Sequence, residues 1–92
     1  MRPKYLHKRH FVEILLLLSQ SPKSFNELLK TLDAYPDTLN RRLKEMQFLN
    51  LITQVEIDGK MKYTLTDKGK RLIPLIEEAL RIIERIEKLI EE

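Results

Sequence analysis

Apolar residues recur with a seven-residue period over positions 75–90, at the end of a chain of only 92 residues. Heptad spacing of this kind is typical of helices that pack against other helices. A chain of this size buries only about two-thirds of its unfolded surface, so a long apolar stripe left over is expected to find a partner. We therefore predict a homodimer; the alternative is a helix that folds back on Leu16 and Leu17 of its own chain. The residues predicted to form the dimer are Leu75, Ile76, Ala79, Ile82, Ile83, Ile86, Leu89 and Ile90.

Charge divides the sequence close to the start of this stripe. Residues 1–71 carry 14 lysines and arginines against 8 acidic residues, whereas residues 72–92 carry 3 against 6. A net positive region suits a polyanion such as nucleic acid, and a net negative region does not. We expect residues 1–71 to form the binding domain and residues 72–92 to form a C-terminal dimerisation helix. Charged residues make up 34% of the chain, a composition that is more typical of proteins from thermophiles.

Several kinds of chemistry are excluded or unsupported. The sequence contains no cysteine, which excludes disulfides, thiolate metal sites and cysteine nucleophiles. No paired catalytic carboxylates, phosphate-binding loop or nucleophile–base pair can be identified, so we predict neither an enzyme nor a cofactor. His7, His10 and Glu13 are spaced along one face of a helix, but two imidazoles without a fixed third ligand are more typical of a solvated face than of a metal site.

The start of the chain imitates a signal peptide, with basic residues followed by an apolar stretch over positions 11–18. Glu13 interrupts that stretch, and the longest unbroken apolar run, residues 14–18, is too short to span a membrane. We expect a cytoplasmic protein that does not contact the membrane.

Three helices are predicted in the first half of the chain. The first covers residues 7–20, because its apolar residues repeat at helical spacing. The second begins at Ser24, which forms a capping box with Glu27. The third begins at Pro36 and ends before Asn50, which suits the left-handed conformation that reverses a chain. The residues expected to face the core are Phe11, Ile14, Leu15 and Leu18 in the first helix, Phe25, Leu28, Leu29 and Leu32 in the second, and Leu39, Leu43 and Met46 in the third.

Residues 51–65 predict a β-hairpin that turns at Asp58 and Gly59. A two-residue loop would pair Val55 with Lys62 and mix apolar and charged side chains on one face. A three-residue loop gives one coherent apolar face, with the pairs Val55–Met61, Thr53–Tyr63 and Leu51–Leu65. Because a shift of one residue moves every side chain to the other face, we predict the three-residue loop, with Gly59 at positive φ.

A long helix is expected from its N-cap Thr66 to about Glu91. Pro74 lies inside this helix and removes one backbone hydrogen bond, which predicts a bend. The order helix, helix, helix, hairpin, helix predicts a mainly α fold with a small β-hairpin, and it is the order of a winged helix-turn-helix.

Short motifs carry a more specific resemblance. Residues 26–30, Asn-Glu-Leu-Leu-Lys, and residues 35–46, Tyr-Pro-Asp-Thr-Leu-Asn-Arg-Arg-Leu-Lys-Glu-Met, resemble the helix-turn-helix of small prokaryotic winged-helix transcription regulators. Residues 49–52, Leu-Asn-Leu-Ile, are similar to the Leu-Gly-Leu-Ile that follows it, and residues 63–69 resemble the Tyr-x-Leu-Thr-x-x-Gly entry into the last helix. The resemblance covers about residues 10–75 and points to the broad group of arsenic-repressor-like, multiple-antibiotic-resistance-like and PadR-like regulators.

This resemblance implies a sequence-specific regulator that binds double-stranded DNA as a homodimer. Its recognition helix, residues 36–49, would lie in the major groove, and its wing, residues 53–64, would contact the backbone or minor groove. The candidate DNA-binding residues are Asp37, Thr38, Asn40, Arg41, Arg42, Lys44, Lys60 and Lys62. We assign base reading to Arg41 and phosphate contact to the wing lysines; the opposing assignment gives the base to Arg42.

Other interpretations stay open at this point. One is an architectural DNA-binding protein of low sequence specificity, and another is a winged helix used as a protein–protein interaction module. The basic residues between Arg2 and Arg9 form either an arm along phosphates or an unstructured terminus. The sequence indicates no particular small-molecule effector.

Overall fold

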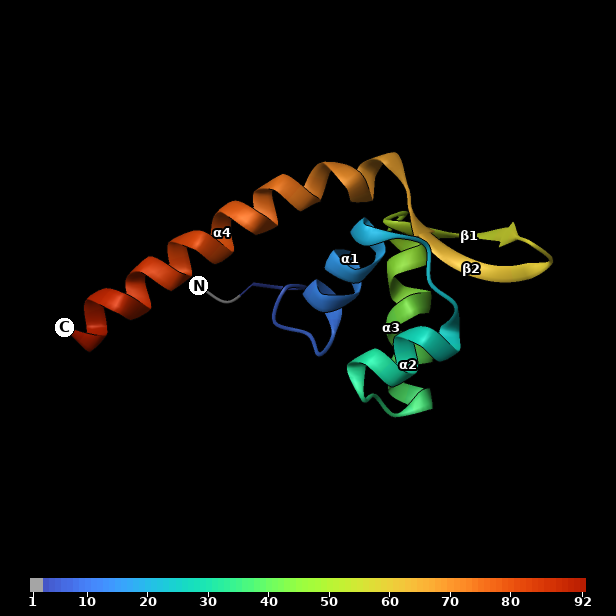
Figure 1. Cartoon of the computed structure of the whole chain (residues 1–92), viewed down its shortest axis with the longest axis horizontal. Helices are drawn as coiled ribbons and strands as arrows, with labels where there is room; N and C mark the ends of the chain where they lie inside the picture. Colours follow the sequence, from blue (N-terminus) through green and yellow to red (C-terminus); the bar gives the residue numbers. More distant parts are fainter. Residues whose placement is uncertain (1–2) are drawn as a thin grey trace.

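The computed structural model describes residues 3–92, so Arg2 lies outside the described part of the chain. Figure 1 shows the first three helices gathered at one end, with the hairpin projecting to one side and the last helix extending to the other. This architecture confirms the predicted fold class, a mainly helical winged helix-turn-helix with one small hairpin and a long C-terminal helix. The elements are α1 (Phe11–Gln20), α2 (Phe25–Leu32), α3 (Pro36–Phe48), β1 (Ile52–Ile57), β2 (Lys60–Leu65) and α4 (Asp67–Glu91).

The first helix begins later than predicted. It starts at Phe11 rather than at residue 7, because His10 has a φ of 66°, a left-handed conformation that cannot continue a right-handed helix. The residues before it form turns and bends. The expectation that His7 and His10 lie together on a solvated helix face is therefore also wrong. His7 is exposed outside α1, whereas His10 is only 8% exposed and its Nδ1 lies 4.0 Å from Oε2 of Glu13.

The other predicted chain reversals and helix starts are confirmed. Ser24 caps α2 through the reciprocal capping box, and Pro36 is the first residue of α3. Asn50, just past the end of α3, has a φ of 61°. The hydroxyl of Thr66 accepts a hydrogen bond from a backbone N–H in the first turn of α4. Each of these ends is determined by a side chain or a conformation within a few residues, which is why local sequence predicts it.

The hairpin does not have the predicted register. A two-residue loop, Asp58-Gly59, joins β1 and β2, and both of its residues have positive φ, 52° and 76°. This is the type I′ geometry that Asp-Gly favours, because its twist matches the twist of paired strands. Positive φ at Gly59 is confirmed, but the three-residue loop and its pairs Val55–Met61, Thr53–Tyr63 and Leu51–Leu65 are wrong. The observed pairs are Ile52–Leu65, Thr53–Thr64, Gln54–Tyr63, Val55–Lys62, Glu56–Met61 and Ile57–Lys60.

The physical reason for this error is the exposure of the hairpin. Only its base is buried, at Ile52 and Leu65, while Met61 is 53% exposed. An apolar face can select a register only where that face is covered. In the open part of the hairpin the preference of the turn decides instead, and Val55 lies opposite Lys62.

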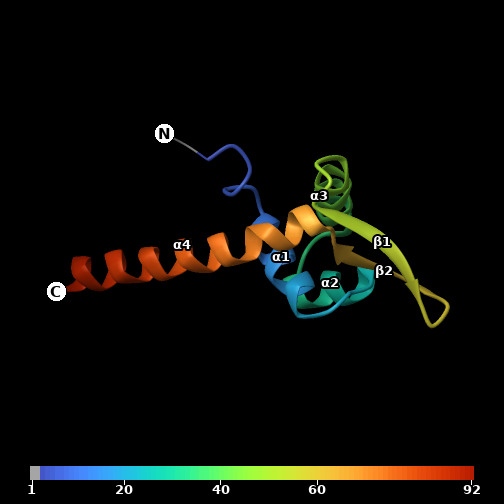
Figure 2. The ribbon, with the colours of Figure 1, turned by 90° about the horizontal axis from the view of Figure 1, so that it is seen from above.

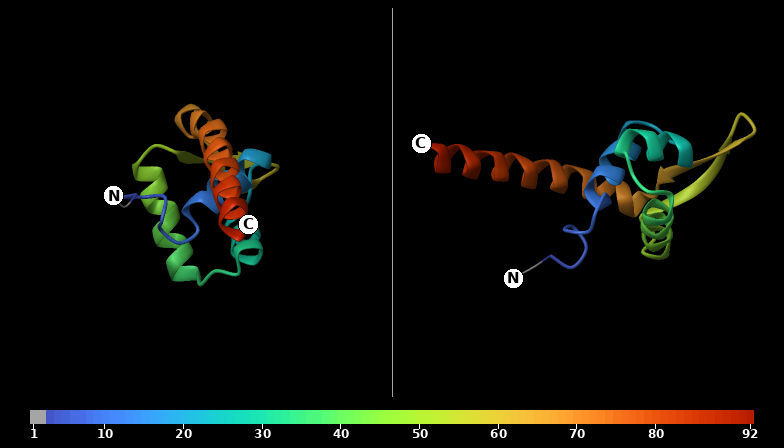
Figure 3. Two further views of the ribbon diagram at one scale, coloured as in Figure 1. Left: turned by 90° about the vertical axis from the view of Figure 1, so that its left-hand side faces the viewer. Right: turned by 90° about the horizontal axis from the view of Figure 1, so that it is seen from below.

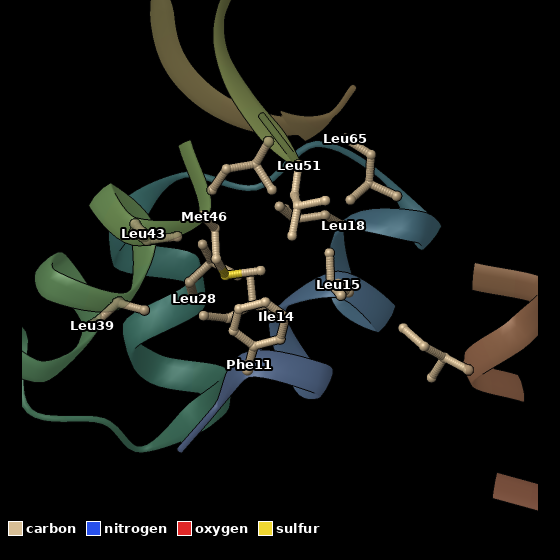
Figure 4. Close-up of a cluster of buried hydrophobic side chains, with 12 residues drawn as sticks. Phe11, Ile14, Leu15, Leu18, Leu28, Leu39, Leu43, Met46, Leu51 and Leu65 are labelled. Carbon is tan, nitrogen blue, oxygen red and sulfur yellow. The ribbon is translucent and has the colours of Figure 1, made fainter. Parts of the chain in front are cut away.

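The core is formed where α1, α2 and α3 meet the base of the hairpin (Figure 4). The inward faces predicted for α1 and α3 are confirmed, since all their predicted core residues are at most 3% exposed. Leu28 is the fully buried residue of α2, and Phe25, Leu29 and Leu32 pack against the core while partly exposed. This core fixes the orientation of α3, and therefore fixes which of its side chains face outward.

The last helix begins against this core and then leaves it. Gly69 lies so close to the hairpin that a Cβ atom there would be 2.2 Å from the carbonyl oxygen of Leu51. Ile76 is the last buried residue, and every residue of α4 beyond it is exposed. The C-terminal part of α4 therefore does not fold back on Leu16 and Leu17. Pro74 lies inside α4, which is a single helix from Asp67 to Glu91. A bend at Pro74 stays a prediction, as does the domain boundary between residues 71 and 72.

Candidate nucleic-acid interface

The side of α3 turned away from the core carries most of the predicted contact residues. Asp37, Asn40, Arg41 and Lys44 are all exposed, and Thr38 is half-buried. Within residues 3–92, the side chain of Arg41 makes no hydrogen bond or ion pair, so its guanidinium is available to a ligand. The helical periodicity that buries the inner face of α3 thus places Arg41 and Lys44 on its exposed face.

Two aromatic residues also lie on the open side of this helix. Tyr35 precedes α3 and is 78% exposed, and Phe48, its last residue, is 88% exposed. Tyr35 stands at the N-cap but makes no capping hydrogen bond with its side chain. Neither residue was among the predicted contacts. The signal that identifies Phe48 was present, because it follows Arg41 and Lys44 at helical spacing.

Arg42 is engaged inside the molecule. Its side chain is only 12% exposed; Nε donates a hydrogen bond of 2.9 Å to the carbonyl oxygen of Arg9, and Nη1 lies 2.9 Å from Oε1 of Glu45. Lys8 pairs with the other carboxylate oxygen of Glu45. The hydrogen bond from Lys8, followed by that from Arg42, holds the pKa of Glu45 below its ordinary value. These contacts bind the N-terminal segment to α3, a connection between residues more than 30 positions apart that no local pattern predicts.

The two wing lysines differ in their surroundings. Lys60 is exposed beside the hairpin loop. Lys62 is 26% exposed, and its Nζ lies 3.4 Å from Oε1 of Glu27 in α2. The pKa of Glu27 lies below its ordinary value, chiefly because it accepts a hydrogen bond from the backbone of Ser24, with Lys62 contributing less. Lys60 is therefore the freer of the two cations.

A groove of about 600 Å³ opens between the N-terminal segment, α1 and α4. Its lining is almost entirely apolar, and it includes Leu6, Val12, Leu75, Leu80 and Ile83. Three of these residues belong to α4, so the groove continues into the apolar side of the projecting helix.

Comparison with known proteins identifies the family. The model of the HxlR-like helix-turn-helix family matches residues 5–90, nearly the whole chain. The chain belongs to the HxlR-like helix-turn-helix family. Membership confirms the resemblance to winged-helix transcription regulators and names the branch of that group, which the motifs alone left open.

Two relatives of this HxlR-like chain are described as HTH-type transcriptional regulators. MJ0361 of Methanocaldococcus jannaschii is 32% identical over 79 residues, which is 80% of this chain and 74% of the relative. BH0655 of Halalkalibacterium halodurans is 35% identical over 75 residues, which is 77% of this chain and 66% of the relative.

Solved structures show the same fold. The reduced form of the transcriptional regulator YodB from B. subtilis superposes with a TM-score of 0.77 at 30% identity, covering 88% of this chain and 89% of YodB. The quinone-bound YodB structure gives a TM-score of 0.79 at 28% identity, covering 92% and 99% of the two chains. The HxlR-like chain is thus a member of a family of transcription regulators, and its described part has the fold of the YodB structures.

Residues 3–92 of this HxlR-like chain contain no group of three or more histidine, cysteine or acidic side chains placed to hold a metal ion. No helix in the same range has the length and apolar character needed to cross a membrane.

Proposed function

We propose that this HxlR-like chain is a sequence-specific regulator that binds double-stranded DNA as a homodimer. The observation that carries the proposal is the open face of α3, where Arg41 is exposed and unengaged within the described residues while the same helix is fixed by a buried inner face. A rigid helix with free donors on its outer side fits the major groove, which a helix can enter. The wing, residues 53–64, would then meet the backbone or the minor groove.

The roles of individual side chains follow from their chemistry and availability. Arg41 can donate two parallel hydrogen bonds to a guanine, and Asn40 can pair with an adenine in the same manner. Thr38 can contact a thymine methyl group. Lys44 and Lys60 carry flexible point charges, which suit phosphate oxygens rather than base edges. Asp37, at the start of α3, favours the positive end of the helix and can accept a hydrogen bond from a cytosine amino group.

A second copy of the chain is the expected partner of α4. The large apolar side chains of α4 at position 75 and beyond position 76 are between 43% and 72% exposed, and their surface continues into the apolar groove. Residues 77–92 carry six acidic and three basic side chains, whereas residues 67–71 carry three basic and one acidic. Two α4 helices in antiparallel pairing would therefore bring unlike charges together while covering the stripe.

Selection of bound duplexes from a random-sequence pool tests the proposal. We expect enrichment of an inverted repeat, because a twofold dimer reads two half-sites of opposite direction. Binding to the selected duplex should be about 10³-fold or more tighter than binding to a scrambled one. Retention of DNA without an enriched sequence would favour the architectural protein, and no retention of DNA would favour the protein–protein module.

A further inference from the structure

The N-terminal segment, residues 4–10, is held against the recognition helix although it forms neither helix nor strand. Arg42 of α3 donates to the backbone carbonyl of Arg9 at 2.9 Å, and Glu45 of α3 pairs with Lys8. Arg42 and Glu45 are themselves joined at 2.9 Å. We call these four residues the clasp.

Contacts within the N-terminal segment and with Phe11 also stabilise its conformation. The rings of Tyr5 and Phe11 stack with their centroids 6.1 Å apart, and Nζ of Lys8 lies 5.4 Å from the Tyr5 ring centroid. The N–H of Lys8 donates to the carbonyl of Tyr5 at 2.9 Å, and the N–H of Phe11 donates to the carbonyl of Lys8 at 3.1 Å. A chain tied at both ends of a turn has little freedom to leave the surface of α3.

The charges of the clasp leave Arg9 as an exposed cation beside α3. Lys8 and Arg42 both face Glu45, so the single carboxylate in the clasp is compensated and does not repel a polyanion. Arg9 is exposed, and only its backbone carbonyl is used by the clasp. Within residues 3–92 its guanidinium has no ion pair.

The position of the segment relative to the wing gives this cation a role. Figure 2 shows the N-terminal segment on one side of α3 and the hairpin on the other, and the right-hand view of Figure 3 shows the same arrangement. The major groove is bounded by a phosphate backbone on each side, so a helix lying in it has phosphates along both flanks. The wing can serve one flank with Lys60, and the N-terminal segment can serve the other.

From this geometry we propose that residues 4–9 are a second phosphate-binding element, in which Arg9 contacts the DNA backbone and Arg42 is a positioning residue. Arg42 lies beside the base-reading side chains of α3 but acts through the carbonyl of Arg9, holding that residue at the edge of the groove. The proposal rests on the proposed DNA-binding function and assigns one further contact to it.

The salt dependence of binding tests the contact. Each phosphate contact contributes about 0.9 to the slope of log K against log salt, so Arg9→Ala should lower the slope of a dimer by about 1.8. Between 50 and 200 mM salt, the affinity advantage of the wild type should therefore shrink about tenfold, both on the selected duplex and on a scrambled one. The matched control is Lys88→Ala, which removes one exposed positive charge from the last turn of α4 and should leave the slope unchanged.

A double-mutant cycle tests the positioning role of Arg42. Arg42→Met keeps an unbranched side chain but loses both donors, so it should reduce the slope about as much as Arg9→Ala does. If Arg42 acts through Arg9, adding Arg42→Met to Arg9→Ala should change the slope no further. Thermal unfolding of each variant establishes that the fold is retained, and Arg9→Ala, at an exposed side chain, keeps the first test valid if Arg42→Met does not fold.

The outcomes separate this proposal from the one on which it rests. Unchanged slopes for Arg9→Ala in a protein that binds its selected duplex would overturn the second phosphate-binding element and leave the regulator intact. Additive losses would show that Arg42 contacts phosphate itself. Absence of DNA binding by the wild type would instead refute the regulator.

Discussion

Replacement of Ile83 by aspartate should separate the proposed homodimer into monomers. Ile83 lies on the projecting part of α4, is 52% exposed in the single chain, and lines the apolar groove. If a second copy covers this side of α4, the substitution places a carboxylate at the contact in both protomers. The winged part of the molecule should remain folded, because Ile83 does not belong to its core.

The size of the effect follows from the exposure of the side chain. Complete burial of an isoleucine is worth about 1.5–3 kcal/mol, so covering the exposed half of Ile83 contributes about 1 kcal/mol per protomer. An unpaired carboxylate in an apolar contact adds a cost of about 1–3 kcal/mol or more per protomer. Two protomers together lose at least about 4 kcal/mol, which raises the dissociation constant about a thousandfold or more.

Analytical ultracentrifugation measures this change directly. The wild type should sediment as a dimer of about twice the 11.0 kDa chain mass at micromolar concentration, and Ile83→Asp as a monomer. Arg85→Asp is the matched control, since it introduces the same side chain two residues away on the opposite side of the helix. An 11.0 kDa wild-type monomer would refute dimerisation through α4, and a dimeric Ile83→Asp would place the interface elsewhere.

Three further predictions concern the fold and the interface. Gly69→Ala should lower the free energy of unfolding by about 1–3 kcal/mol, seen as a lower Tm, because the new Cβ would meet the carbonyl oxygen of Leu51 at 2.2 Å. Arg41→Ala should weaken binding to the selected duplex by about 1–3 kcal/mol and to a scrambled duplex much less, whereas Lys60→Ala should weaken both alike. The pKa of Glu45 is lowered in the folded protein, so its carboxylate stabilises the fold near neutral pH, and this contribution is lost as the pH falls through the lowered pKa. Chemical unfolding of the wild type and Glu45→Gln should therefore show a difference in stability that narrows towards acid pH.

Each of these predictions has an outcome that contradicts it. An unchanged Tm for Gly69→Ala would mean that the backbone at the start of α4 moves away from β1 at little cost. Equal losses for Arg41→Ala on selected and scrambled duplexes would transfer base reading to another residue. A stability difference between the wild type and Glu45→Gln that persists at acid pH would mean that the clasp does not depend on the charge of Glu45.

Features determined over a few residues were predictable from the sequence. The capping box at Ser24, the proline at the start of α3 and the left-handed Asn50 each act on the backbone within one turn. The inward faces of α1 and α3 follow from helical periodicity, because the core covers those faces completely. The exposed side of α3 was predictable for the same reason, since it is the complement of a buried face.

The hairpin register and the start of α1 were predicted wrongly, for two different reasons. Near the tip of the hairpin no other described element packs on the strands, so an apolar face there gains nothing from burial. Asp58-Gly59 therefore adopts its preferred turn. At the start of α1 the apolar pattern itself begins at Phe11, and nothing in the spacing of the preceding residues shows that His10 is left-handed. Periodicity predicts register only where the surface it describes is buried.

Arg42 shows why the outward direction of a side chain does not settle its role. On a helical wheel it flanks the exposed face, beside Arg41, and both are plausible contacts for DNA. The difference between them arises outside α3: the carbonyl of Arg9, 33 residues away in sequence, accepts a hydrogen bond from Arg42, whereas no described residue engages Arg41. A guanidinium that already donates to a carbonyl and a carboxylate would have to give up those bonds to bind DNA, so Arg41 is the arginine better placed to read a base.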